Sequence, residues 1–554
     1  MAGNNEGAAK KSTPRVATWG PLLLRPIPKD NYAVYMMNAI ANHEGSKPSV
    51  IDAESGEFRT YSYLRENVPR VAGGLRSSGV CPGDVVVFLS PNHIDYQLLL
   101  LSVMYCGASF APVNPDLTSG ELSHMIQKSC ARWAICHPSK LDNFQKAVGL
   151  LPGNTIRKTW ILEQRSENSI YNLMDSPPAN PVTIENGLDF KKSVALILFS
   201  SGTTGFPKGV LLSHENLLLS HAINRYLQAL MTPEEAARGK QINERPLLMM
   251  PMCHLFGFVI SMGVLAPGCT VILLKRFTPN TFFQAIEKHK VTICHLVPHL
   301  VNFLSKTPLY DQYDTSSVLG FTSATAPLGK ETANAFIKRT GRILGSGYGL
   351  TETGGITGNG GALGFKAGSV GRIMPYVRIK VLNVTTGEML GDNEEGEICI
   401  NSPGNMVGYA NDLKATKGMI DDEGWVHTGD IGYFDKDNFL YITDRMKDLI
   451  KVKGFQVSPS ELELVLLGHD GVSEVAVIGV PHDRTGEAPR AYVVPAPGAH
   501  LDAKQLQEYV RDRVVPYKQM TGGIVFVDSL PRNLTGKLLR KKLKEEFTKT
   551  KSKL

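Results

Sequence analysis

The pattern of apolar positions in residues 60–113 changes three times between a helical and a strand pattern. In residues 60–78 they recur every three or four positions, which predicts a helix, and a second helix is expected at 94–104. The runs 85–89 and 109–113 are predicted to be buried strands, and 85–89 is continuously apolar and partly β-branched. The alternation recurs at residues 134–135, 159–162, 194–199 and 291–298. Helices alternating with buried strands are typical of an α/β domain with a largely parallel sheet.

The pattern changes near the C-terminal end. Ser460 precedes Leu462, Val465 and Leu466, which predicts a capped amphipathic helix, and strands are expected at 475–480 and 491–494. A chain of 554 residues is too long for one core. We therefore divide it into a flexible segment (1–30), a large domain (31–444), a small α+β domain (445–551) and a terminal tripeptide (552–554).

Charge and cysteines exclude several classes of protein. Residues 531–554 carry nine lysines and arginines against two glutamates, so this stretch accounts for the whole net charge of +7. A nucleic-acid binder would more often carry a basic face with interleaved aromatic residues, so we expect a solvated helix and no nucleic-acid partner. The eight cysteines show neither C-x-x-C pairs nor metal-ligand spacing, which predicts reduced thiols.

Neither a membrane span nor a secretory signal is expected. The uncharged runs 96–113 and 255–274 approach the length of a transmembrane helix, but turn residues interrupt both, so each is predicted to be a buried helix followed by a buried strand. Near the N-terminus, Leu22-Leu23-Leu24 stops at Arg25-Pro26, too early for the apolar region of a signal peptide.

A hydroxyl- and glycine-rich stretch after the apolar run 194–199 is suited to binding an anion. It reads Ser200-Ser201-Gly202-Thr203-Thr204-Gly205-Phe206-Pro207-Lys208-Gly209. Glycines permit a tight loop whose N–H groups converge on phosphate oxygens, and the hydroxyls and Lys208 add donors. An ordinary hairpin between two strands is the alternative that these residues leave open. A Walker A loop is excluded, because that pattern ends in Gly-Lys-Ser/Thr.

This stretch closely resembles the signature loop of the adenylate-forming enzymes, the superfamily of acyl-CoA synthetases, 4-coumarate-CoA ligases and beetle luciferases. Other motifs of that family follow in its order, at residues 251–258, 345–353, 424–432, 441–451 and 531–537. The resemblance runs from Tyr32 to about Lys541. It implies an α/β fold with a large layered αβαβα N-terminal domain, which includes a β-barrel-like part, and a small mobile C-terminal domain.

The resemblance also assigns roles to individual residues. Lys537 would bridge the substrate carboxylate and phosphate, Thr351 would contact phosphate, Glu352 and Thr204 would hold Mg²⁺, and Lys447 would lie near the pivot of the hinge. Asp430 and Arg445 would contact the ribose, and Tyr348 would stack on the base. Lys451, Lys453 and Gly454 would serve the CoA step. The remaining nucleotide-site residues implied are Ser200, Ser201, Gly202, Thr203, Thr204, Gly205, Lys208, Ala324, Thr325, Ala326, Ser346, Gly347 and Gly349. The acyl pocket implied is His254, Phe256, Phe258, Gly349, Leu350 and Gly355, whereas His295 is interpreted as structural.

Two positions depart from the family pattern. Ser346 stands where many members have glutamine, and Thr325 stands where many have glycine. The shape and hydrogen bonding of the nucleotide pocket are therefore expected to differ there.

The implied reaction has two halves. A carboxylate and MgATP give an acyl-adenylate and pyrophosphate, and the CoA thiol then displaces AMP to give a thioester. A luciferase-like monooxygenase is an alternative, but Gly354-Gly355-Ile356 stands where beetle luciferases continue with Thr-Ser-Ala. A non-catalytic nucleotide-binding homologue would be expected to lack Lys537, Glu352 or Asp430, and a peptide-synthetase module would be followed by a carrier domain.

The final residues suggest a location. Ser552-Lys553-Leu554 matches a peroxisomal address read by a soluble import receptor. We therefore expect a peroxisomal enzyme, and for the same reason we favour a fatty or other hydrophobic acid as substrate over an aromatic propenoate such as 4-coumarate.

Overall fold

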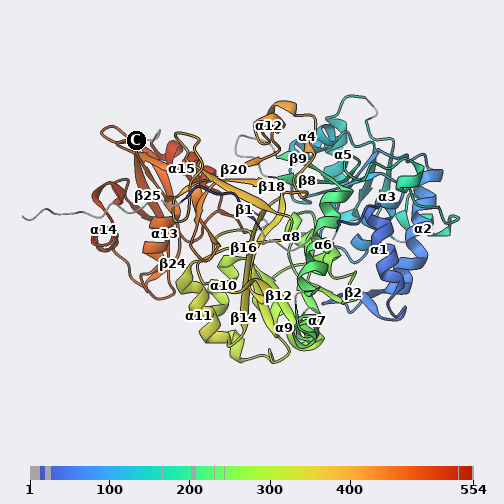
Figure 1. The fold of residues 1–554 in the computed structure, drawn as a ribbon, viewed down its shortest axis with the longest axis horizontal. Coiled ribbons are helices and arrows are strands. Elements are labelled where there is room, and N and C mark those ends of the chain that lie inside the picture. The colour runs from blue at the N-terminus through green and yellow to red at the C-terminus, as the bar shows by residue number, and fades with distance from the viewer. Residues whose placement is uncertain are drawn as a thin grey trace, which may run out of the picture.

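The computed structural model describes residues 13–18, 26–153, 155–163, 167–200, 207–229, 231–242, 244–533 and 536–551. Within these residues three sheets organise a mixed α/β fold, with a large N-terminal part and a small C-terminal part. Figure 1 shows the small part, in red, at one end of the molecule and the first helices, in blue, at the other.

The seven-stranded sheet has the order β19-β9-β8-β5-β4-β6-β7. Its strands β4, β5, β6, β7 and β8 pair in parallel, as the alternating pattern predicted. All five residues of β4 are buried, which explains its continuous apolar sequence. The strands are β4 (Val85–Leu89), β5 (Ser109–Val113), β6 (Trp133–Cys136), β7 (Lys158–Ile161), β8 (Val194–Ser200), β9 (Lys208–Ser213) and β19 (Gly408–Tyr409), and the helices between them are α3 (Tyr96–Tyr105), α4 (Ser119–Ser129) and α5 (Leu141–Gly149).

The fourteen-stranded sheet joins a parallel half to an antiparallel half. Strands β2 and β10–β14 pair with one another in parallel, and β3 pairs antiparallel with β2 at the edge. On the other side of β14, strands β15 to β18, β20, β21 and β1 pair antiparallel. Its strands are β1 (Ala17–Thr18), β2 (Pro48–Asp52), β3 (Phe58–Thr60), β10 (Pro246–Leu248), β11 (Val271–Leu273), β12 (Ile293–Leu296), β13 (Gly320–Ser323), β14 (Ile343–Leu350), β15 (Gly354–Asn359), β16 (Gly371–Ile373), β17 (Arg378–Leu382), β18 (Gly396–Asn401), β20 (Val426–Phe434) and β21 (Phe439–Arg445).

Further helices of the large part pack on these two sheets. Helix α2 buries Tyr61, Leu64, Val68, Val71 and Leu75, the stripe predicted from the sequence. The helices are α1 (Tyr32–Ala41), α2 (Tyr61–Ser77), α6 (His214–Ala229), α7 (Pro233–Ile242), α8 (Leu255–Gly263), α9 (Pro279–His289), α10 (Pro298–Lys306), α11 (Lys330–Thr340) and α12 (Leu413–Lys417).

The small part contains the five-stranded sheet and three helices. Its strands are β22 (Ile450–Val452), β23 (Phe455–Val457), β24 (Val472–His482), β25 (Gly486–Pro495) and β26 (Ile524–Phe526), and its helices are α13 (Pro459–Leu467), α14 (Ala503–Arg511) and α15 (Arg540–Lys551). Helix α15 is less solvated than expected, because Leu543 is buried and Arg540 is bonded to Glu463.

The predicted cap of α13 is wrong by two residues. Ser458 is the N-cap, and its Oγ accepts a hydrogen bond from the N–H of Glu461. Pro459 takes the first helical position, where its fixed φ and missing N–H cost nothing. Ser460 therefore lies inside the helix, and its N–H donates to Asp444 Oδ2 at 3.0 Å.

No helix in the described part of the chain is long and apolar enough to cross a bilayer. The two long uncharged runs are α3 followed by β5 and α8 followed by β11, as predicted. All eight cysteines are free thiols.

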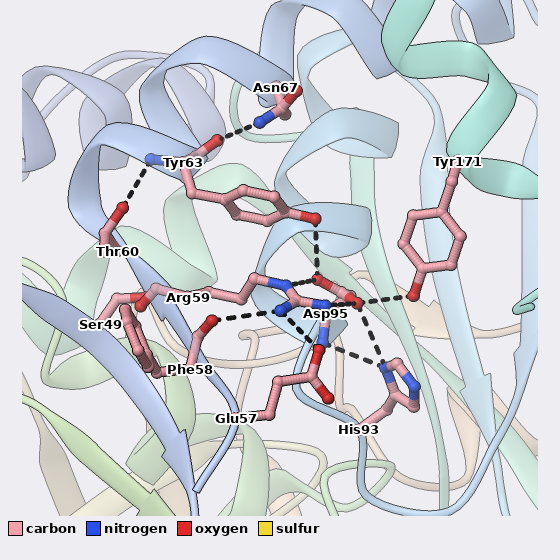
Figure 2. Close-up of polar contacts among 10 residues, drawn as sticks. All are labelled: Ser49, Glu57, Phe58, Arg59, Thr60, Tyr63, Asn67, His93, Asp95 and Tyr171. Atoms are coloured by element: carbon pink, nitrogen blue, oxygen red, sulfur yellow. Dashed lines mark hydrogen bonds and ion pairs between the residues drawn. The ribbon is translucent and has the colours of Figure 1, made fainter. Parts of the chain in front are cut away.

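Asp95 anchors a buried polar network that joins β3, α2, α3 and the 3₁₀ helix η2 (Ile170–Asp175) (Figure 2). Its carboxylate accepts hydrogen bonds from Arg59 Nε at 2.6 Å, Arg59 Nη2 at 3.0 Å, Tyr63 Oη at 3.1 Å and Tyr171 Oη at 2.6 Å. Burial opposes ionisation of Asp95, but the Arg59 guanidinium outweighs it and holds the pKa of this carboxyl below its usual value. Removing Arg59 would leave the buried charge of Asp95 uncompensated, so the network fixes the turn that leads from β4 into α3.

Candidate functional site

A large cavity of about 1,940 Å³ lies between the large and small parts. It receives residues from both halves of the large sheet, from α6 and α8, and from the C-terminal part. The predicted site residues that line it are Ser200, Lys208, His254, Phe256, Phe258, Ala324, Thr325, Ala326, Gly347, Tyr348, Gly349, Leu350, Thr351, Glu352, Gly355, Asp430, Arg445 and Lys537. Residues from six separate sequence motifs therefore face one space.

Four predicted residues do not line this cavity. The Oγ of Ser346 lies 3.1 Å from Asn359 Nδ2, and both residues line a separate, much smaller pocket. Lys451, Lys453 and Gly454 are exposed on the hairpin of β22 and β23. Residues 201–206, which include the candidate metal ligand Thr204, lie outside the described residues.

The candidate anion loop connects two strands that pair as a hairpin. Strand β8 pairs antiparallel with β9, and Ser200 is opposite Lys208 at the end of the ladder next to the connecting loop. The two strands therefore form the hairpin that the sequence offered as an alternative. A hairpin does not exclude anion binding by its connecting loop, and anion binding stays a prediction. Lys208 Nζ lies 4.9 Å from the centre of the Tyr409 ring.

Glu352 is a buried carboxylate bonded to two hydroxyl groups. Its Oε1 accepts hydrogen bonds from Ser200 Oγ and from Tyr409 Oη, each at 2.9 Å. Burial, and then the Glu352 charge, raise the pKa of Tyr409, so the phenol stays protonated and donates. Tyr409 was not predicted as a site residue, because no spacing rule connects it with a carboxylate 57 positions away.

Asp430 and Arg445 form an ion pair across adjacent strands. The two residues face each other in the β20–β21 ladder, and Arg445 Nε lies 2.9 Å from Asp430 Oδ1. Tyr348 Oη donates to the other oxygen of Asp430 at 2.6 Å. The predicted base-stacking ring and the predicted ribose contacts are therefore one connected group.

Lys537 brings a positive charge from the small part into the cavity. Burial, and then Arg445, lower the pKa of its ammonium group, while Asp430 and Glu352 act in the opposite direction. Burial, and then Lys537, lower the pKa of His254 to about 4, so this imidazole is neutral near pH 7. A Cβ on the neighbouring Gly536 would lie 2.6 Å from the His299 ring, so the loop of Lys537 packs closely on α10.

Backbone geometry explains one glycine and one departure from the family pattern. A Cβ at Gly349 would lie 2.2 Å from the carbonyl oxygen of Gly354, so the pairing of β14 with β15 requires glycine there. Thr325 has a φ of 81°, a left-handed conformation that is unfavourable for a β-branched residue. The glycine common at this position in the family would adopt it freely.

We therefore expect Thr325→Gly to raise the free energy of unfolding. Relief of left-handed strain is worth about 1–2 kcal/mol, and the extra chain entropy of glycine offsets about 0.5–1 kcal/mol of it. Ala326→Gly is a matched control, because Ala326 is not among the positive-φ residues, and this change should destabilise. Urea unfolding of both variants tests the expectation, and equal shifts in both would contradict it.

An apolar face of α6 lines the cavity and was not predicted from the sequence. Leu219, Ile223 and Leu227 recur every four residues and line the cavity together with Phe256 and Val259 of α8. The helical spacing of these three apolar residues is visible in the sequence. Spacing alone does not distinguish a helix face that borders a cavity from one that packs into the core.

Comparisons with known proteins agree with this geometry. The chain matches the AMP-binding enzyme family over residues 37–410 and the AMP-binding enzyme C-terminal domain over residues 461–537. It is 35% identical to 4-coumarate–CoA ligase 3 of Arabidopsis thaliana over 541 residues, which cover 94% of this chain and 91% of the relative. It is also 35% identical to luciferin 4-monooxygenase of Photinus pyralis over 507 residues, which cover 89% and 90%.

Solved structures are similar over the same length. ATP-bound MatB from Rhodopseudomonas palustris has a TM-score of 0.83 and 28% identity, and the match covers 93% of this chain and 98% of MatB. From its two family domains, its long relatives and this common fold, the chain belongs to the AMP-binding enzymes of the adenylate-forming superfamily.

Proposed function

We propose that this protein is an ATP-dependent carboxylic acid–CoA ligase that makes an acyl-adenylate and then an acyl-CoA thioester. The observation that supports it most is the meeting of Lys537, Glu352 and Asp430 in one cavity beside an apolar wall. A purified-protein assay tests it: carboxylate-dependent release of pyrophosphate, followed by thioester formation when CoA is added. Absence of both products across a broad panel of acids would reject the proposal.

The residues fit the adenylation step. Tyr348 would stack on the adenine, and Asp430 with Arg445 would bind the ribose. A carboxylate attacking the α-phosphate is repelled by the phosphate charge, so the cationic Lys537 would stabilise the crowded oxygens as the new bond forms. Because His254 is neutral, it would contact the carboxylate end of the acid through a hydrogen bond. No protein nucleophile is needed, so catalysis would rest on alignment and electrostatics.

Glu352 fits a magnesium ligand. It is a buried carboxylate on the cavity wall, and Mg²⁺ in nucleotide sites commonly uses one or two carboxylates plus phosphate oxygens. A bound Mg²⁺ would neutralise charge on the phosphates.

Tyr409→Phe should raise the Mg²⁺ concentration needed for half-maximal adenylation by about 10-fold. The substitution removes a hydrogen bond to a charged carboxylate, worth about 1.5 kcal/mol, but keeps the ring beneath Lys208. Tyr409→Leu, which also removes the ring, should in addition raise KM for ATP. A Mg²⁺ titration of the pyrophosphate-release rate measures the effect. If the Phe variant kept the wild-type Mg²⁺ dependence, Tyr409 would not position Glu352.

A fatty or other hydrophobic acid is the proposed substrate class. Leu219, Ile223, Leu227, Phe256 and Val259 form an apolar wall of the cavity, which suits a chain or ring without charge. A panel of fatty acids of increasing length, with cinnamate and 4-coumarate beside them, separates fatty acids from aromatic propenoates by kcat/KM.

A luciferase-like monooxygenase is the alternative function, because luciferases are relatives of similar identity. Luciferin, ATP and oxygen are therefore added in a parallel assay, where light emission would favour this alternative.

The peroxisomal location stays a proposal. Residues 552–554 lie outside the described residues. Deleting Ser552-Lys553-Leu554 should leave ligase activity unchanged and shift a fluorescent fusion from peroxisomes to the cytosol. Continued import of the truncated protein would contradict the proposal.

A further inference from the structure

Three side chains with metal-ligand atoms meet on the ladder between β18 and β20, at the rim of the cavity. Cys399 is paired with His427 in this ladder, and Glu397 precedes Cys399 by two residues on the same face. The Sγ, Nδ1 and carboxylate oxygen of the three residues all lie within 4.8 Å of one another. None of the three was singled out as a candidate ligand in the sequence, because the cysteine and the histidine are 28 positions apart.

The distances between these atoms suit a tetrahedral ion. His427 Nδ1 lies 2.9 Å from Glu397 Oε2 and 3.5 Å from Cys399 Sγ. Tetrahedral Zn²⁺, with bonds of about 2.0–2.3 Å, separates its ligand atoms by roughly 3.3–3.6 Å. An ion would therefore require only a small opening of the Glu397–His427 pair.

When the imidazole is neutral, hydrogen bonding among the three groups leaves one of them poorly satisfied. Nδ1 of a neutral imidazole carries either one proton or one lone pair. It can donate to Glu397 or accept from the thiol of Cys399, but it cannot do both. A cation would instead take the nitrogen lone pair, the sulfur and the carboxylate oxygen at once.

A second observation concerns the far side of the imidazole. Nε2 of His427 lies 3.5 Å from Asp421 Oδ2. A ligating histidine usually directs its other N–H to a carboxylate or carbonyl, which fixes the ring and strengthens the metal bond. Cys399 is fully buried, while the His427 side chain is 33% exposed and provides a route of entry.

We propose that Glu397, Cys399 and His427 form a binding site for a thiophilic divalent cation of the Zn²⁺ class, distinct from the site at Glu352. Binding breaks the S–H bond of Cys399 and releases its proton to solvent, so the two anionic ligands balance the charge of the ion. The site adjoins the nucleotide residues, because Glu397 Oε1 accepts the N–H of Gly429 at 3.2 Å, one residue before Asp430.

Cobalt titration of the full-length, chelator-treated protein tests the proposal. Excess Mg²⁺ is present throughout to occupy oxygen-only sites. Co²⁺ should bind as one tight equivalent and give the intense near-ultraviolet charge-transfer band of a thiolate ligand, and Zn²⁺ should abolish the band by displacing Co²⁺. Wild-type protein without this band at saturating Co²⁺ would overturn the proposal, whatever the variants do.

Two variants assign the ligands. Cys399→Ser should lose the band, whereas Cys81→Ser, which changes an exposed free cysteine, should keep it. Asp421→Asn keeps the Oδ1 acceptor that binds the N–H groups of Glu423 and Trp425, and it should weaken Co²⁺ binding by about 10–100-fold without removing the band. Persistence of the band in Cys399→Ser, its loss in Cys81→Ser, or unchanged affinity in Asp421→Asn would each contradict the site.

Discussion

Lys537→Ala should slow acyl-adenylate formation by about 10²–10³-fold, the cost of removing one electrostatic contact to a developing transition state. In the structure this lysine shares the cavity with Glu352 and Asp430 and lowers the pKa of His254. Its charge therefore stands where carboxylate and phosphate oxygens would crowd together. Thioester formation from supplied acyl-adenylate and CoA should stay within a few-fold of wild type, because that step no longer has the repulsion between carboxylate and triphosphate.

The two half-reactions are measured separately. Pyrophosphate release reports adenylation, and chromatographic detection of the thioester from synthetic acyl-adenylate reports the second step. Lys541→Ala is the matched control, since Lys541 is exposed on α15 of the same part, and it should leave both steps unchanged. Equal loss of both steps in Lys537→Ala would mean that the lysine is needed for the shape of the site and not for adenylation alone.

Local pattern predicted the elements well where burial imposes a clear period. The helix with Tyr61, Leu64 and Val68 and the fully buried strand Val85–Leu89 lie where the sequence indicated. The cap of α13 was misplaced, because Ser458 and Ser460 are both good caps and only the place of Pro459 decides between them. Hydrophobic spacing cannot decide between two neighbouring residues that are both good N-caps.

Contacts between distant residues had no signal in the sequence. Asp95 gathers Arg59, Tyr63 and Tyr171, and Tyr409 donates to Glu352, through side chains that come together only when the sheets are assembled. The reaction itself was reached through family resemblance, because an α/β sheet with an anion loop is compatible with many activities. The structure adds which of the motif residues share one cavity.

If the proposed two-step reaction holds, the present arrangement of the small part suits the first half-reaction. Lys537 faces the cavity, whereas Lys451, Lys453 and Gly454 are exposed on a hairpin that does not line it. The connection between the parts runs through Asp444, whose Oδ2 accepts hydrogen bonds from Ser458 Oγ and the Ser460 N–H. For the hairpin to serve a CoA step at the same cavity, the small part would have to rotate about this connection and withdraw Lys537.

Gly454→Trp should therefore form acyl-adenylate at the wild-type rate and reduce conversion of acyl-adenylate to thioester by about 10²-fold or more, the scale of effect expected from misplacing a reacting group. Gly498→Trp is a close control. Gly454 and Gly498 have φ values of 84° and 77°, and an added Cβ at either would meet nothing within 4 Å. The two substitutions thus carry a similar backbone penalty, and only the one at Gly454 lies on the hairpin predicted to admit the thiol arm of CoA.

Stopped reactions that quantify acyl-adenylate and thioester over time distinguish the outcomes. The expected result is accumulation of bound acyl-adenylate in Gly454→Trp, with Gly498→Trp behaving as wild type, which is the reverse of the defect in Lys537→Ala. If Gly454→Trp and Lys537→Ala lost the same half-reaction to the same degree, one fixed arrangement of the small part would account for both steps. Separate losses would favour two arrangements, because Lys537 lines the cavity in this structure whereas the hairpin does not.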